Sequence, residues 1–231
     1  MLMNKLRLLS VILFLLFANN SFAFNTQRGL SKGHVVYKLA NTSIPSTYKY
    51  KLAINTLKDD VAPRLTKYMH RHIKNIYIVE YMEPKYIGAG NEICGTYYNS
   101  DIVLSVSQRC KIKNIGYYAV HEFSSIIYKK YKSEFPFNKW RRANKYPYRS
   151  DKKWDIISAG QNYLSKTVSR SRGFWKPYSM VSVEEDYNVL IGYYYQDHHK
   201  LMKNIKKYPI IESKLKLANK FFIKHRNSSQ P

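Results

Sequence analysis

Two neighbouring residues, His121 and Glu122, could together bind a metal ion and activate water. They lie in the segment Tyr117-Tyr-Ala-Val-His-Glu-Phe-Ser-Ser-Ile-Ile127. In one zinc-binding pattern, two histidines four residues apart share a helix face and bind the metal, while a glutamate after the first histidine acts as general base. His121 and Glu122 match the first two positions of this pattern, and Ser125 stands at the third. A serine hydroxyl is a weak zinc ligand, so the chemistry of this helix depends on how Ser125 is interpreted.

A second block of residues follows about fifty positions later. Gly173-Phe174 is followed by Tyr178, and the pair Glu185-Asp186 comes seven residues after this tyrosine. In order and register the two blocks resemble the zinc-binding metallopeptidase family of bacterial cell surfaces, which is of the gluzincin type. The family's pattern is HExxH on one helix, then Gly-Phe, a tyrosine, and a Glu-Asp pair that opens a second helix. The resemblance covers roughly residues 70–210.

The resemblance implies a role for each matching residue. His121 and Glu185 would be zinc ligands, and Ser125 stands at the position of the remaining metal ligand. Glu122 would be the general base, and Tyr178 would hydrogen-bond the oxyanion of the tetrahedral intermediate. Zinc with an open position lowers the pKa of its water and polarises the scissile carbonyl. The implied protein is a hydrolase that cleaves a protein or peptide with metal-activated water.

Departures from the family pattern leave two functions open. Besides Ser125, Asn188 and Val189 replace the alanine and the final glutamate of the second helix motif. The chain is therefore either a zinc metallopeptidase or a catalytically inactive homologue that binds a partner through its cleft or its basic surface. Two further histidines, His198 and His199, would lie about 20 Å beyond Glu185 on a continuous helix. The sequence does not exclude the others as replacement ligands: His34, His70 and His72.

A simpler interpretation needs no metal. Ser182 stands three residues before Glu185, and Ser-x-x-Glu is a capping box at a helix start. In this interpretation Glu184 and Asp186 are solvated acids in the first turn, where the helix dipole favours negative charge.

The elements that must position these residues follow from hydrophobic periodicity. These elements predict an α+β fold in one small domain over residues 24–231, and the resemblance implies that this domain is zincin-like. We expect a short sheet with an edge hairpin and a helix carrying His121. The predicted elements are a helix over 47–75 with a kink or break at Pro63, a strand over 76–81, the active-site-type helix over 115–131, a short helical segment within 135–144, and two closing helices over 183–206 and 209–224. Residues 24–45 are expected to be irregular.

The chain has two cysteines, Cys94 and Cys110, with two β-prone runs and an Asn99-Ser100-Asp101 turn between them. An even cysteine count in an exported protein favours a disulfide, which here would clamp the hairpin. Two isolated cysteines lack the paired spacing of a structural zinc site.

The first 23 residues have the features of a cleavable signal peptide. Lys5 and Arg7 precede an apolar run from Leu8 to Ala18, and Ser21-Phe22-Ala23 supplies small residues before the cut. The run is too short to span a bilayer comfortably. We also expect no transmembrane segment in the mature chain. We expect export to the periplasm or the extracellular space.

The chain is strongly basic, with 39 Lys and Arg against 15 Asp and Glu and a net charge of +24. Removing two leader cations leaves +22 (24 minus 2). Lysine is spread through nearly every segment and no nucleic-acid motif accompanies it, so no nucleic-acid partner is expected. An anionic envelope surface remains a possible partner.

Overall fold

The structure is a computed structural model that describes residues 36–37, 47–61, 65, 68–69, 71–80, 93–144, 146–148 and 166–228. The predicted signal peptide lies outside these residues, as do His34, His70 and Pro63. Export therefore stays a prediction.

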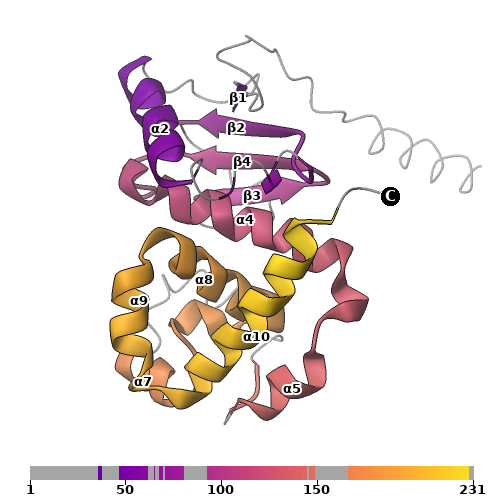
Figure 1. Ribbon diagram of the computed structural model, residues 1–231. Helices are drawn as coiled ribbons and strands as arrows, with labels where there is room; N and C mark the ends of the chain where they lie inside the picture. Colours follow the sequence, from indigo (N-terminus) through magenta and orange to yellow (C-terminus); the bar gives the residue numbers. More distant parts are fainter. Residues whose placement is uncertain are drawn as a thin grey trace, which may run out of the picture.

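A four-stranded sheet forms one end of the molecule (Figure 1). Its order is β1-β2-β4-β3, with β1 parallel to β2, β2 parallel to β4, and β3 antiparallel to β4. Val36 and Tyr37 pair with the start of β2, so the expectation of an irregular segment over 24–45 is wrong at these two residues. That pairing joins distant segments and has no local signal. The strands are β1 (Val36–Tyr37), β2 (Asn75–Val79), β3 (Gly95–Tyr98) and β4 (Asp101–Ser105).

The predicted edge hairpin and its clamp are confirmed. Strands β3 and β4 are joined at Asn99 and Ser100, and β3 is the outer strand. A disulfide joins Cys94, just before β3, to Cys110, which follows β4.

Helix α4 (Ile115–Lys130) separates the sheet from a helical half of the molecule (Figure 1). It contacts β3 and β4 on one side and α8 on the other. Because both sides are covered, twelve of its sixteen residues are buried, from Ile115 to Tyr128. The other helices are α2 (Thr47–Asp60), η2 (Ile112–Asn114), η3 (Lys132–Glu134), α5 (Phe137–Arg142), α7 (Lys166–Ser171), η5 (Pro177–Met180), α8 (Val183–Gln196), α9 (His198–Ile205) and α10 (Pro209–Arg226).

Two predicted helices are interrupted. In the segment predicted as a helix over 47–75 with a kink or break at Pro63, α2 ends at Asp60, and Leu65, Tyr68 and Met69 are again helical. Residues 71–74 are not helical, so the helical segment ends before residue 75. The helix predicted over 183–206 is two helices, because Asp197 adopts the non-helical angles φ −134° and ψ 53°. The break allows α9 to bury Leu201 and Ile205. No helix among the described residues is long and apolar enough to cross a membrane.

Candidate functional site

His121 and Glu185 face each other across the contact between α4 and α8. The Nε2 atom of His121 lies 3.1 Å from Oε2 of Glu185, and each residue is 8% exposed. Ser182 fixes the first turn of α8, because its side chain accepts a hydrogen bond from the backbone N–H of Glu185 at 3.1 Å. The predicted helix cap and the predicted approach of Glu185 to His121 therefore coexist.

The histidine and the carboxylate form an ion pair. Burial alone would lower the pKa of His121, but the hydrogen bond to Glu185 and the negative charges of Glu122 and Glu185 together raise it. The imidazole is thus stabilised in its protonated form by the carboxylate that faces it.

Glu122 lies on the side of α4 that faces the sheet. A Cβ added to Gly95 would come within 2.9 Å of its Oε1 atom, so the glycine at the start of β3 permits a close approach. Glu122 is buried, with 8% of the residue exposed. Its negative charge helps to raise the pKa of His121.

Tyr178, in η5, lies beside the same pair. Its ring centroid is 6.2 Å from that of His121. Burial, the charge of Glu185 and a hydrogen bond to Glu185 raise the pKa of Tyr178 well above its usual range, so its phenol stays protonated.

Ser125, which stands where the resemblance would place a second histidine, is hydrogen-bonded to an amide of the facing helix. Asn188 donates from Nδ2 to Ser125 Oγ at 2.6 Å, and its Oδ1 accepts from Ser124 Oγ at 2.8 Å. All three side chains are buried. Ser125 and Asn188 are two departures from the family pattern, and the structure brings them together.

These donors do not fit a peptidase zinc centre. Such a centre has three protein ligands and an open position. His121 and Glu185 supply two, and Ser125, at the third position, is engaged by Asn188. Among the described residues, no group of three or more His, Cys, Asp or Glu side chains could hold a metal ion.

Three histidines considered as replacements, His72, His198 and His199, do not supply a third ligand among the described residues. His72 is buried, with Phe123 and Tyr131 beside its ring at centroid distances of 6.0 and 6.3 Å. His198 and His199 are exposed at the start of α9. The helix from Glu185 to these two histidines is not continuous, because it breaks at Asp197. Even so, among the described residues the two histidines belong to no group that could hold a metal ion.

An aromatic and cationic cluster borders His121, and sequence reasoning missed it. The Tyr117 ring lies 5.8 Å from His121, and Lys176 Nζ lies 5.0 Å from Tyr117 and 4.5 Å from Tyr193. Gly192 makes room for Tyr117, because a Cβ there would come within 2.7 Å of the ring. Burial, with the charges of Lys166 and Arg170, lowers the pKa of Lys176 to about 8.

Asp186 is fully buried, so its interpretation as a solvated first-turn acid is wrong. Its Oδ2 lies 2.5 Å from Lys214 Nζ on α10 and accepts from Tyr148 at 2.7 Å and Trp140 at 3.2 Å. Adjacent residues of α8 thus bind opposite neighbours, Glu185 toward α4 and Asp186 toward α10. No signal in the sequence indicated the pairing of Asp186 with Lys214, because the two residues lie on different helices.

The arrangement of helices and strands is similar to that of a solved peptidase-like structure. A crystal structure of a proposed zinc-binding metallo-peptidase from Bacteroides caccae aligns with a TM-score of 0.56, covering 90% of this chain and 83% of that chain at 15% identity. No family model matches the sequence, and no curated protein matches it. The fold is therefore α+β and metallopeptidase-like, with a disulfide between Cys94 and Cys110.

Proposed function

We propose that this protein is an exported, metallopeptidase-like binding protein that has lost the zinc site of a peptidase. The observation that carries the proposal is the hydrogen bond from Asn188 to Ser125, the residue that the resemblance aligns with the second histidine. The similarity in fold supports descent from a metallopeptidase architecture. Export rests on the predicted signal peptide.

The energetics favour the metal-free arrangement. Ser125 Oγ accepts a buried hydrogen bond from Asn188, and displacing that amide to bind zinc would leave a buried polar group unpaired, at a cost of about 1–3 kcal/mol. His121 and Glu185 already contact each other, with Nε2 3.1 Å from Oε2. Each candidate ligand therefore has a partner within the protein.

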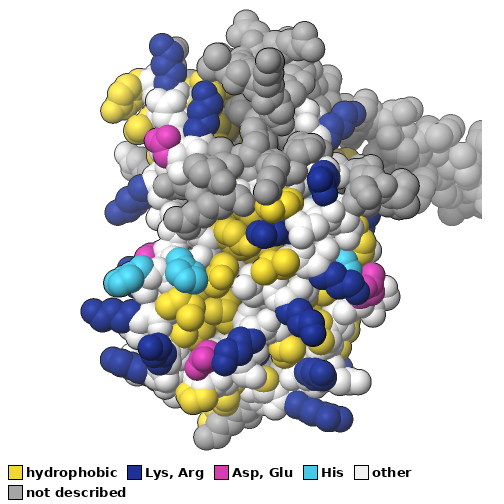
Figure 2. Space-filling model, viewed as in Figure 1, with side chains coloured by type: hydrophobic (Ala, Val, Ile, Leu, Met, Phe, Trp, Pro, Cys, Tyr) yellow, Lys and Arg dark blue, Asp and Glu magenta, His cyan; other side chains and the backbone are white. Residues whose placement is uncertain are grey.

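The surface supports binding as the remaining activity. Lys and Arg side chains are distributed over the visible face, with hydrophobic side chains exposed between them (Figure 2). This mixture suits a protein or peptide partner better than a polyanion, whose binding needs a continuous basic stripe.

A metal and stability measurement tests the proposal. Mature protein (residues 24–231) should contain no stoichiometric zinc, and its melting temperature should not change with added zinc or with a chelator, since a ligand stabilises only what it binds. Glu122→Gln should leave partner binding unaltered.

The competing function is an active zinc peptidase, implied by the resemblance and by the retained Glu122 and Tyr178. Stoichiometric zinc, a melting temperature lowered by chelator, and proteolysis that disappears in Glu122→Gln would establish it and overturn the proposal.

A further inference from the structure

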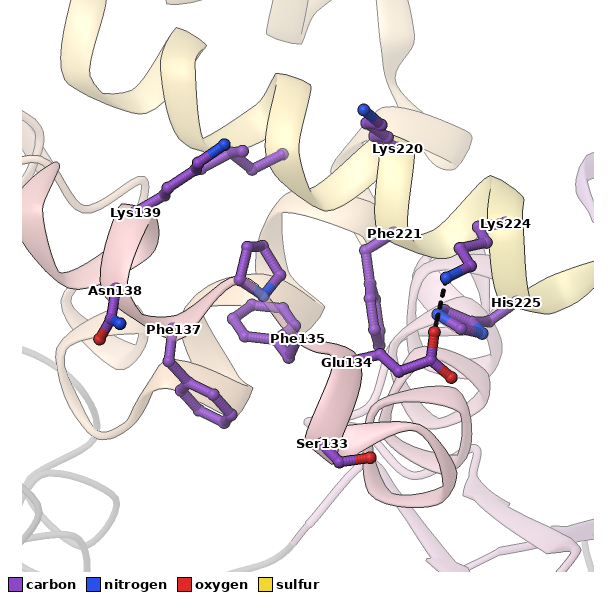
Figure 3. A pocket seen from close by; sticks show the side chains of 12 residues that line it. Ser133, Glu134, Phe135, Phe137, Asn138, Lys139, Lys220, Phe221, Lys224 and His225 are labelled. Atoms are coloured by element: carbon purple, nitrogen blue, oxygen red, sulfur yellow. Dashed lines mark hydrogen bonds and ion pairs between the residues drawn. The ribbon is translucent and has the colours of Figure 1, made fainter.

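A groove runs between the η3–α5 segment and α10, away from His121. Its volume is about 680 Å³, within the range of ligand-binding pockets. Figure 3 shows aromatic side chains from both walls converging on its floor. The apolar lining comprises Phe135, Pro136, Phe137, Leu217 and Phe221.

The rim of the groove is basic. Lys139 on α5 and Lys220 on α10 stand on opposite walls, and neither has an ion-pair partner within the described part of the chain. The acidic group in the lining, Glu134, is already engaged, since Lys224 Nζ lies 2.5 Å from Oε2 and His225 Nε2 lies 3.6 Å from it. The groove therefore presents an apolar floor and uncompensated positive charge.

We propose that this groove binds an acidic segment of a partner protein, with one apolar side chain on the aromatic floor and carboxylates beside Lys139 and Lys220. The inference rests on the proposed binding function and names the kind of partner. Charge complementarity selects the occupant, because two opposed cations match side-chain carboxylates at the ends of an apolar anchor. A nucleic-acid backbone would need a longer row of cations than the groove supplies.

The test uses a synthetic library of octapeptides with a central Phe or Leu and flanking positions drawn from Asp, Glu, Ser, Lys and Gly. We expect selection on the mature protein to enrich peptides with Asp or Glu on both sides of the apolar residue. Fluorescence polarisation with an enriched peptide then measures affinity for each variant. Failure to enrich acidic peptides would overturn the inference.

Matched variants locate the binding. Lys139→Glu with Lys220→Glu should weaken the peptide at least about tenfold, because it replaces two attractions by repulsions. Lys51→Glu with Lys111→Glu makes the same change in net charge at exposed positions outside the groove lining. This control should keep affinity within about twofold.

A second variant tests the floor. Leu217 is half-buried in the groove, and Leu217→Ser should also weaken binding without changing net charge. Equal losses in the groove and control charge variants would overturn the inference in favour of diffuse electrostatic attraction, as would full affinity in Leu217→Ser.

Failure of this inference is distinguishable from failure of the proposed function. The zinc and chelator measurements do not involve the groove, so absence of peptide binding with no bound zinc overturns this inference alone. Stoichiometric zinc overturns the proposed function whatever the groove binds.

Discussion

The side-chain amide of Asn188 donates a 2.6 Å hydrogen bond to Ser125 and so joins α8 to α4. Both residues depart from the pattern that the sequence resembles, and the contact pairs the two departures. Ser125 leaves a space and a polar group, and Asn188 satisfies that group from the facing helix. As a result, the hydroxyl of Ser125 is hydrogen-bonded to a protein amide at the position that the resemblance assigns to a metal ligand.

Restoring the zinc site should therefore require two substitutions. Ser125→His alone places an imidazole against the Asn188 amide, whereas Ser125→His with Asn188→Ala also removes the obstruction. We expect zinc to stabilise the double variant by about 2.7 kcal/mol at a free concentration one hundred times its Kd. Calorimetric titration and melting with zinc check this. Equal zinc affinity in the single and double variants would contradict it, and Glu185→Gln in the double variant is the control.

The buried pair of Lys214 and Asp186 should be important for stability. Lys214→Met leaves the Asp186 carboxylate unpaired in the core, and breaking one partner of a buried pair costs about 3–5 kcal/mol. Adding Asp186→Asn should recover part of the loss, because the uncompensated charge disappears. Urea unfolding measures both variants. A loss below about 1 kcal/mol for Lys214→Met would contradict this role, since that is the range of exposed pairs.

Stability should fall as the solution is acidified below neutral pH. Burial and the charge of Lys130 lower the pKa of His72 from 6.5, and burial lowers that of His225 although Glu134 opposes the shift. The unfolded chain then binds more protons than the folded chain between the lowered values and 6.5, so stability is retained above pH 6.5 and lost as the pH falls through that window.

Unfolding free energies measured across this pH window check the effect. Phenylalanine keeps an aromatic ring without a titrating nitrogen, so His72→Phe with His225→Phe should flatten the dependence. An unchanged slope in this variant would assign the acid sensitivity to other groups.

Lys176 should be the most readily acylated lysine near the candidate site. With a pKa of about 8, roughly half of its amine is neutral at pH 8, whereas an ordinary lysine remains almost fully protonated. Limited labelling with an amine-reactive ester, followed by peptide mass analysis, should find Lys176 modified ahead of the exposed Lys203. Removing the two rings that Lys176 Nζ contacts, in Tyr117→Ala with Tyr193→Ala, should reduce this preference by admitting water. Labelling of Lys203 first would contradict the lowered pKa.

Local patterns in the sequence were sufficient to predict several elements. Apolar spacing predicted the helix over 115–131, and β-prone runs between Cys94 and Cys110 predicted the clamped edge hairpin. The break at Asp197 was missed because residues 183–206 carry no glycine or proline at the point where the chain changes direction.

The site itself was only partly accessible from sequence. The motif named His121, Glu122, Tyr178 and Glu185, and their relative placement follows from the packing of α4 on α8. The hydrogen bond between Ser125 and Asn188 could not be predicted, because it joins side chains 63 residues apart and depends on how two helices rotate against each other. The roles of these residues in chemistry stay predictions.

Helix α10 contributes both a wall of the groove and the lysine that binds Asp186, which adjoins Glu185 on α8. The groove and the His121 pair are thus connected through one rigid helix. Because coupling between two sites is reciprocal, a substitution at Glu185 changes groove affinity only to the extent that the occupant of the groove changes the free energy of the His121–Glu185 contact. Peptide affinity measured in Glu185→Gln would quantify that coupling free energy, and an unchanged affinity would show the two regions to be energetically independent.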